Sequence, residues 1–233
     1  MNLLKRILLK NNKAAKALSG EDKYYQDLFI KNKRWNTAEP NEEELTRWLI
    51  INDFFSVINA EFGKRTLKIL DLGCGRGWLA NKMSVYGNVT GVEPVDTVVE
   101  YGKTLFPHLD LRQGTSKDLL AHGAMGSFDI VVSSEVIEHI PDSDKPAFVK
   151  DINLLLKPDG FSIITTPRKD IQEEWLEYCD PDQPVEDWMY EITLKELFIA
   201  AGFIDKKLER YACSPKPSAP ELEVYQLWLF QKN

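Results

Sequence analysis

A short glycine-rich stretch between an apolar run and a helical pattern constrains the fold of this chain more than any other feature. It covers residues 69–79 and reads Ile-Leu-Asp-Leu-Gly-Cys-Gly-Arg-Gly-Trp-Leu. Residues 68–72 have the apolar character of a strand, the glycines permit a sharp turn, and helical spacing resumes at Trp78. A strand, a glycine turn and a helix start in this order offer free backbone N–H groups to a ligand.

The spacing of the glycines argues against two common nucleotide sites. A dinucleotide site requires G-x-G-x-x-G, whereas this chain has G-x-G-x-G and places Trp78 where the third glycine would stand. The Gly-Lys-Ser/Thr sequence of a phosphate-binding P-loop is also absent. The sequence D-L-G-C-G-R-G, residues 71–77, instead resembles the first motif of the class I S-adenosylmethionine-dependent methyltransferases.

Later segments extend this resemblance over residues 68–203 in the order that the family requires. A second predicted strand, residues 88–92, ends in Glu93, about twenty residues after Asp71, the interval expected for an acid that receives a ribose diol. Residues 128–141, F-D-I-V-V-S-S-E-V-I-E-H-I-P, resemble the fourth motif of small-molecule methyltransferases, including those of quinone biosynthesis and sugar tailoring. The Asp/Asn-Pro-Pro-Tyr/Phe motif of DNA amino-methyltransferases is absent there.

The resemblance implies an α/β, Rossmann-like class I methyltransferase fold. Its sheet would be seven-stranded and mostly parallel, in the order 3-2-1-4-5-7-6, with helices on both faces. Residues 1–62 would form N-terminal helices and a cofactor lid, and residues 63–233 the S-adenosylmethionine-binding domain, with an acceptor-side insertion at 168–190. We also expect a helix over 42–62 ended by Gly63, a helix over 145–156 stopped by Leu-Lys-Pro-Asp-Gly before a strand over 161–166, and a helix over 193–201 capped by Thr193.

The same resemblance implies S-adenosylmethionine as cofactor and S-adenosylhomocysteine as product. Asp71 and the glycine backbone would hold the cofactor, Glu93 its ribose hydroxyls, and Pro94 would pack near the adenine. Many relatives place an acid after the third strand, whereas this chain has Thr115 and Ser116, so their hydroxyls, backbone groups or Asp118 would recognise the adenine. The residues predicted to contact the cofactor are Asp71, Gly73, Cys74, Gly75, Gly77, Glu93, Pro94, Thr115, Ser116, Ser133, Ser134 and Glu135.

His139 is the candidate catalytic residue, because a histidine that titrates near neutrality can remove a hydroxyl proton as the methyl group is transferred. Two other roles stay open, a different task in the active site and a hydrogen bond that only holds the loop. Aromatic and basic residues of the lid and the insertion could line an acceptor pocket or simply pack into the core. The predicted acceptor contacts are Trp35, Arg168, Trp175 and Tyr190.

The composition of the chain limits the kinds of molecule that it is expected to bind. A net charge of −7 argues against a surface for a nucleic-acid backbone and favours a small-molecule acceptor. The sequence has no run of about 18 apolar residues, so it predicts no membrane span. Its three scattered cysteines suggest neither a disulfide framework nor a metal site, which fits a cytoplasmic protein. Residues 1–18 carry five basic residues and no acid in a helical pattern, which predicts a helix that packs on its own domain, frays, or docks on a membrane or partner.

The leading functional hypothesis is an enzyme that moves a methyl group from S-adenosylmethionine to an oxygen or nitrogen of a small metabolite, such as a saccharide, quinone or secondary-metabolite precursor. One alternative is a protein methyltransferase whose peptide lies between residues 24–36 and 175–190. Another is a scaffold that binds the cofactor without turnover. The sequence leaves the acceptor, the oligomeric state and the choice between oxygen and nitrogen open.

Overall fold

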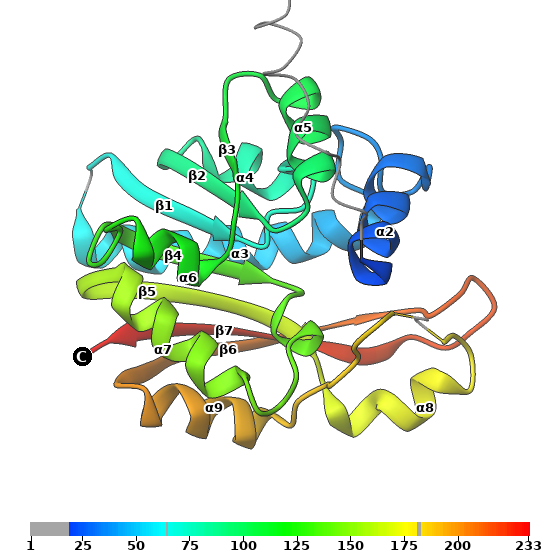
Figure 1. Cartoon of the computed structure of the whole chain (residues 1–233). Coiled ribbons are helices and arrows are strands. Elements are labelled where there is room, and N and C mark those ends of the chain that lie inside the picture. Colours follow the sequence, from blue (N-terminus) through cyan, green and yellow to red (C-terminus); the bar gives the residue numbers. More distant parts are fainter. Residues whose placement is uncertain (1–18, 64, 181–182) are drawn as a thin grey trace, which may run out of the picture.

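The computed structural model describes residues 19–63, 65–180 and 183–233. Its centre is a seven-stranded sheet in the order β3-β2-β1-β4-β5-β7-β6, which confirms the predicted order (Figure 1). The first five strands pair in parallel, and β7 is antiparallel to both of its neighbours. The strands are β1 (Leu67–Leu72), β2 (Gly87–Glu93), β3 (Asp110–Gln113), β4 (Phe128–Ser134), β5 (Leu156–Pro167), β6 (Phe203–Cys213) and β7 (Leu222–Lys232). The basic segment 1–18 lies outside the described residues.

Helices cover both faces of this sheet, and each face has its own apolar core. Successive residues of a strand point to opposite faces, so Ile69 belongs to one core and Leu70 to the other. The first core includes side chains of α3 (Glu42–Phe62), α4 (Trp78–Met83) and α5 (Asp96–Leu105). The second includes those of α6 (Ser116–Ala121), α7 (Lys145–Leu155) and α9 (Glu191–Ala200).

Helix α3 begins and ends where the sequence predicts. The side chain of Asn41 accepts from the backbone N–H of Glu44, and the Glu44 carboxylate accepts in return from that of Asn41, which forms a capping box. Gly63 ends the helix with φ 69°, in the left-handed region that glycine adopts without strain. The buried side of α3 packs Ile51 and Phe54 into the first core.

Two boundaries differ from the sequence prediction. The stretch predicted to stop α7 is already part of β5, because Leu156 both follows the helix and pairs with Phe128 of β4. The chain turns within this pairing at Asp159, which has φ 61°. A register shift between Phe128 and Ile130 of β4 accommodates the turn. Helix α9 begins at Glu191 after Tyr190, so Thr193 lies inside the helix and does not cap it.

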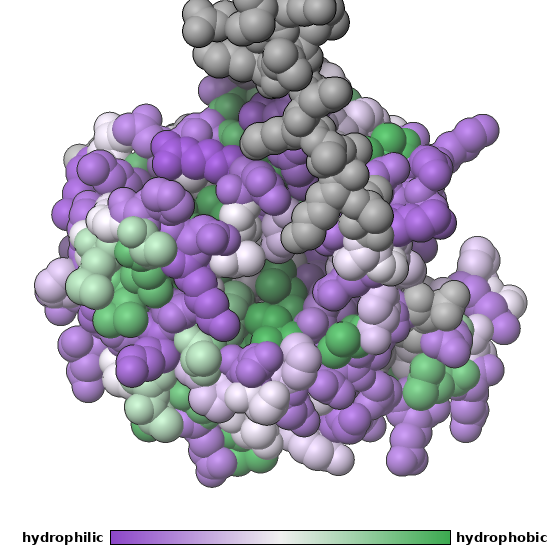
Figure 2. Space-filling model, viewed as in Figure 1, coloured by the Kyte–Doolittle hydropathy of each residue, from purple (hydrophilic) through white to green (hydrophobic). Residues whose placement is uncertain are grey.

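Two excursions from the alternating pattern border the carboxyl edge of the parallel strands. The predicted lid, residues 20–41, includes α2 (Gly20–Gln26) and the π-helix η1 (Asp27–Lys31), and these two helices lie beside α5 (Figure 1). The insertion contains the short helices η3 (Lys169–Ile171) and α8 (Gln172–Leu176). The face seen in Figure 2 is mostly hydrophilic, with small separate apolar groups. Within the described ranges, no helix has the length and apolar character needed to cross a bilayer.

Candidate active site

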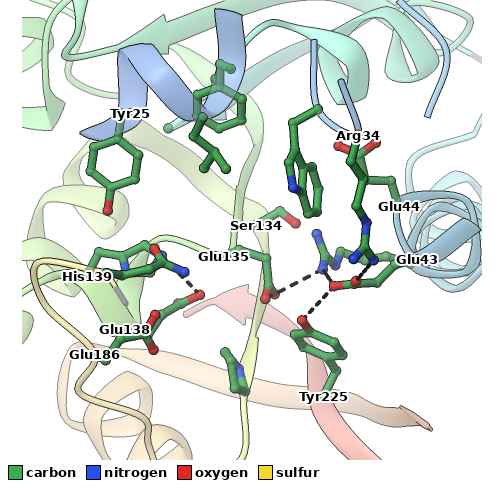
Figure 3. Close-up of a pocket in the computed structure, with 18 of the residues that line it drawn as sticks. Tyr25, Arg34, Glu43, Glu44, Ser134, Glu135, Glu138, His139, Glu186 and Tyr225 are labelled. Carbon is green, nitrogen blue, oxygen red and sulfur yellow. Dashed lines mark hydrogen bonds and ion pairs between the residues drawn. The ribbon is translucent and has the colours of Figure 1, made fainter. Parts of the chain in front are cut away.

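A pocket of about 1550 Å³, its open mouth included, lies at the carboxyl edge of the sheet between the lid and the insertion (Figure 3). Its walls come from distant parts of the chain: the lid, the start of α3, the glycine turn, the segment after β4, the insertion and β7. Ligands of open α/β sheets bind at this edge, because the loops after parallel strands converge there. The two segments that resemble methyltransferase motifs, the glycine turn and the segment after β4, therefore meet at one cavity.

The glycine turn is held against β2 by backbone hydrogen bonds. The N–H groups of Gly73 and Cys74 both donate to the carbonyl of Val92, at 2.8 and 3.0 Å. Gly73 has φ 81°, and a Cβ atom added there would lie 2.4 Å from the side chain of Val136. A Cβ atom at Gly75, which has φ 49°, would lie 2.9 Å from the lid residue Phe29. The turn therefore needs glycine at both positions for conformation and for space.

Asp71 and Glu93 are two buried carboxylates beside this turn. Oδ2 of Asp71 is buried and has no hydrogen-bond partner, although the residue lines the pocket. Burial raises the pKa of Asp71 to about 7, partly offset by a hydrogen bond from the backbone of Ala80. Glu93 accepts the backbone N–H of Gly75 at 3.2 Å and that of Val95 at 3.0 Å. Burial raises the pKa of Glu93 to about 7 as well.

The remaining predicted cofactor contacts have mixed surroundings. Thr115 caps α6 by exchanging hydrogen bonds with Asp118, and the hydroxyl of Ser116 donates to Asp151 at 2.7 Å. Ser133 is buried with an unpartnered hydroxyl, whereas Ser134 lines the pocket and its hydroxyl lies 2.9 Å from that of Thr165. The cofactor candidates that do not line the pocket are Gly77, Glu93, Pro94, Thr115, Ser116 and Ser133.

The lid is fastened to the glycine turn by Arg76, whose side chain is fully buried. Its guanidinium donates to both carboxylate oxygens of Glu44, at 2.7 and 2.8 Å, and Nε donates to the carbonyl of Thr37 at 2.6 Å. Farther along the lid, Phe29 covers Gly75 and Trp35 lines the pocket. Sequence reasoning missed Arg76, since an arginine between two glycines carries no signal that its partner lies in α3.

His139 lies in η2 (Ile137–His139) and lines the pocket (Figure 3). Its Nδ1 lies 3.0 Å from the carbonyl oxygen of Val185 in the insertion. Its Nε2 lies 3.7 Å from Oε1 of Glu138, and its ring packs edge-on against the lid residue Tyr25 at a centroid distance of 5.9 Å. The structure therefore places the predicted catalytic residue where the lid, the insertion and the segment after β4 meet.

Two glutamates precede His139 closely in the chain: Glu138 is buried, and the side chain of Glu135 is 19% exposed. Oε1 of Glu135 accepts the hydroxyl of Thr165 at 2.7 Å, and its Oε2 lies 3.6 Å from Nη2 of Arg47. Its φ of 56° is in the left-handed region, a costly conformation for a residue with a side chain. Oε2 of Glu138 accepts the hydroxyl of Thr166 at 2.9 Å. Burial raises the pKa of both glutamates to about 8, against the lowering effects of Arg47 and of these hydroxyls.

Glu138 and Glu186 were not among the predicted site residues. The spacing of Glu135, Glu138 and His139 in S-E-V-I-E-H was the available signal, because positions three and four apart share a face of a helical turn. Glu186 comes from the insertion, and no local pattern indicates that it approaches His139. Among the residues that the structure describes, no group of His, Cys, Asp or Glu side chains is arranged to hold a metal ion.

The four predicted acceptor contacts divide into two pairs. Trp35 and Trp175 line the pocket, and Trp175 packs against Trp188 with ring centroids 6.2 Å apart. Arg168 and Tyr190 lie outside the pocket lining. The guanidinium of Arg168 is engaged by Glu191 and Glu223, each at 3.0 Å, and Tyr190 is half exposed before α9.

These surroundings fit S-adenosylmethionine. The unpartnered oxygen of Asp71 would accept a hydrogen bond from the ammonium group, and the glycine turn would leave room for the ligand against the backbone. Each oxygen of Glu93 accepts one hydrogen bond, so lone pairs remain for two ribose hydroxyls. When bound, the cofactor supplies a methyl group that its sulfonium already activates.

Comparison with known proteins agrees with this fit. Residues 40–206 match the family described as methyltransferase domain. The ubiquinone biosynthesis O-methyltransferase of Actinobacillus pleuropneumoniae serotype 7 is 33% identical over 126 residues, which cover 51% of this chain and 52% of that protein. Across the first curated relatives, the chain spans 29 to 52% of their lengths.

Solved structures agree in fold. The PH0226 protein of Pyrococcus horikoshii has a TM-score of 0.68 at 17% identity, with 91% of this chain and 99% of that chain covered. The magnesium protoporphyrin IX methyltransferase of Synechocystis with bound SAM has a TM-score of 0.65 at 13% identity, covering 94% and 100%. With its glycine turn, its sheet order and a family match over most of its length, this chain belongs to the methyltransferase domain family, whose cofactor is S-adenosylmethionine.

Proposed function

We propose that this protein methylates a hydroxyl group of a phenolic quinone precursor. The observation that carries the proposal is the environment of His139. Its Nδ1 is occupied by the carbonyl of Val185, while its Nε2 is 3.7 Å from Oε1 of Glu138, beyond hydrogen-bond distance, and the residue lines the pocket. A hydroxyl acceptor needs such a base, because it becomes a strong nucleophile only as its proton leaves. The names of the curated relatives, ubiquinone biosynthesis O-methyltransferases, support the quinone class.

The walls of the pocket suit a planar acceptor. Tyr25 of the lid packs edge-on against the His139 ring, and Trp175 and Trp188 of the insertion line the same pocket. Aromatic side chains bind rings by offset or edge-on packing, and they exclude water from the reacting oxygen. In this arrangement the chain orients the hydroxyl and accepts its proton, and these are the two tasks that remain when the methyl group is already activated.

The proposal is tested by incubating the protein with S-adenosylmethionine and a 3,4-dihydroxylated aromatic compound, and by measuring the methylated ring and S-adenosylhomocysteine by mass spectrometry. We expect one methyl group per ring on oxygen, and a rate at least tenfold lower in His139→Gln, since a general base contributes about 10² to 10⁴. An arylamine of the same ring size is the matched acceptor. Methylation of the amine alone, with His139→Gln unaffected, would refute the proposed reaction.

We further propose a cytoplasmic enzyme that acts on small molecules. The free thiols of Cys74, Cys179 and Cys213 support a reducing compartment. The net charge of −7 disfavours a nucleic-acid acceptor. Fractionation of cells expressing the tagged full chain tests the location.

A further inference from the structure

The last part of the insertion runs beside η2 and is held there by its backbone. The carbonyl oxygen of Val185 lies 3.0 Å from Nδ1 of His139. Two positions later, the N–H of Asp187 donates to the carbonyl of Glu138 at 2.8 Å. Because the backbone is fixed on both sides of Glu186, the place of this residue beside η2 is fixed as well.

The side chain of Glu186 lines the pocket at the end that contains His139 (Figure 3). Its Oε2 accepts the indole N–H of Trp188, a residue that is 6% exposed. Its Oε1 has no hydrogen-bond partner among the residues that the structure describes. One oxygen therefore holds the carboxylate in place, and the other is left for a ligand.

The surroundings of this carboxylate indicate what kind of group it would bind. Burial raises the pKa of Glu186, whereas the Trp188 N–H and His139 oppose this rise because they stabilise the ionised form. An ionised carboxylate can only accept hydrogen bonds. Trp175 lines the same pocket and packs against Trp188. An aromatic acceptor beside these rings would therefore offer Glu186 a hydrogen-bond donor.

We propose that Glu186 is a specificity-determining residue, whose Oε1 accepts a hydrogen bond from a second hydroxyl group of the acceptor, next to the one that is methylated. The inference rests on the proposed O-methylation. It narrows the acceptor to an aromatic ring with two adjacent hydroxyl groups. Trp188 holds the carboxylate in the orientation that this contact requires.

The test compares kcat/KM for 3,4-dihydroxybenzyl alcohol with the values for 3-hydroxybenzyl and 4-hydroxybenzyl alcohol. We expect the wild type to prefer the diol by roughly tenfold or more, since a monophenol leaves the carboxylate oxygen unpaired. In Glu186→Gln the amide oxygen would accept the Trp188 N–H, so an NH₂ group that cannot accept a hydrogen bond would replace Oε1. The preference should then be largely lost, while the Kd for S-adenosylmethionine stays unchanged.

Glu43→Gln is the matched control. Glu43 also lines the pocket, but both of its carboxylate oxygens are engaged, one by the hydroxyl of Tyr225 at 2.6 Å and the other by Arg34 at 2.8 Å. We expect this variant to keep the wild-type preference for the diol, whatever its overall rate. An equal loss of preference in both variants would overturn the proposal, and so would a Glu186→Gln variant that slows diol and monophenols alike. A preference that disappears on chelation and returns with magnesium would also overturn it, since a cation would then bind the diol.

A second measurement does not depend on turnover. Calorimetric titration of the diol and the monophenols into protein saturated with S-adenosylhomocysteine should show the same preference in the wild type and its loss in Glu186→Gln. If no hydroxyl group is methylated but this binding difference appears, the proposed function fails while the role of Glu186 stands. If hydroxyl groups are methylated but the wild type shows no preference for the diol, the role of Glu186 fails while the proposed function stands.

Discussion

The buried pair of Arg76 and Glu44 allows a prediction whose size follows from the structure. Both side chains are at most 2% exposed, and their two hydrogen bonds are 2.7 and 2.8 Å long. Arg76→Leu would leave the Glu44 carboxylate buried without its cation, a defect that costs about 3 to 5 kcal/mol. For a chain of this size each kcal/mol shifts Tm by about 2 to 4 °C. We therefore expect Tm to fall by roughly 6 to 20 °C in calorimetry.

A double variant separates stability from lid anchoring. Arg76→Met with Glu44→Leu replaces the ion pair by apolar side chains, a change that is often close to neutral. It still removes the hydrogen bond to the Thr37 carbonyl, which holds the end of the lid near α3. We expect part of the Tm loss to be recovered, since Glu44→Leu also removes the capping-box hydrogen bond that Glu44 accepts from Asn41. The Kd for S-adenosylmethionine, measured by calorimetric titration, should stay several-fold above the wild-type value.

The control for both variants is Arg65→Leu at the opposite edge of the sheet. Arg65 pairs with Asp129 at 2.9 Å, but its side chain is 48% exposed and Lys157 also neutralises Asp129. Such a pair contributes about 0 to 1 kcal/mol. If Arg76→Leu destabilises the protein no more than Arg65→Leu does, or if cofactor affinity is unchanged in the double variant, the reasoning about the lid is refuted.

Three further predictions concern the pocket. Gly73→Ala should raise the Kd for S-adenosylmethionine at least tenfold, because the added Cβ atom would meet the side chain of Val136. The control is Gly123→Ala, since Gly123 has a similar φ of 84° and open space around it. This variant should leave the Kd unchanged and lower only the stability of the protein. Trp175→Ala should raise the KM for the acceptor several-fold and spare cofactor binding, whereas the same substitution at Tyr190, outside the pocket, should alter neither. Without ligand, the free energy of unfolding should fall as the pH rises from about 5 to about 8, because buried acids with raised pKa values bind protons that the unfolded chain has released. A free energy of unfolding that stays constant or increases over this range in urea titrations would contradict the raised pKa values. The acids are Asp71, Glu93, Glu135 and Glu138.

Much of the site could be predicted from the sequence because its signals are local. The glycine turn, the acid at the end of β2 and the buried strand before His139 each lie within a few neighbouring residues. Parallel strands bring their carboxyl ends to one edge, so these signals also predict that Asp71, Gly73 and His139 line one pocket, as observed. Trp35 and Trp175 line it too, whereas Arg168 is diverted into ion pairs with Glu191 and Glu223.

The order of the sheet followed from the resemblance of the sequence motifs to the methyltransferase family. Local patterns determined the boundaries of α3 and the glycine turn, because periodicity, caps and turns depend on neighbouring residues. Only the tertiary structure decided the partners of the charged side chains. Arg76 meets Glu44 across 32 positions, and His139 meets the Val185 carbonyl across 46. Such contacts depend on how loops pack after the sheet has formed, and no periodic pattern in the chain records them. The hydrogen bond that orients His139 and the fastening of the lid are therefore properties of the folded protein.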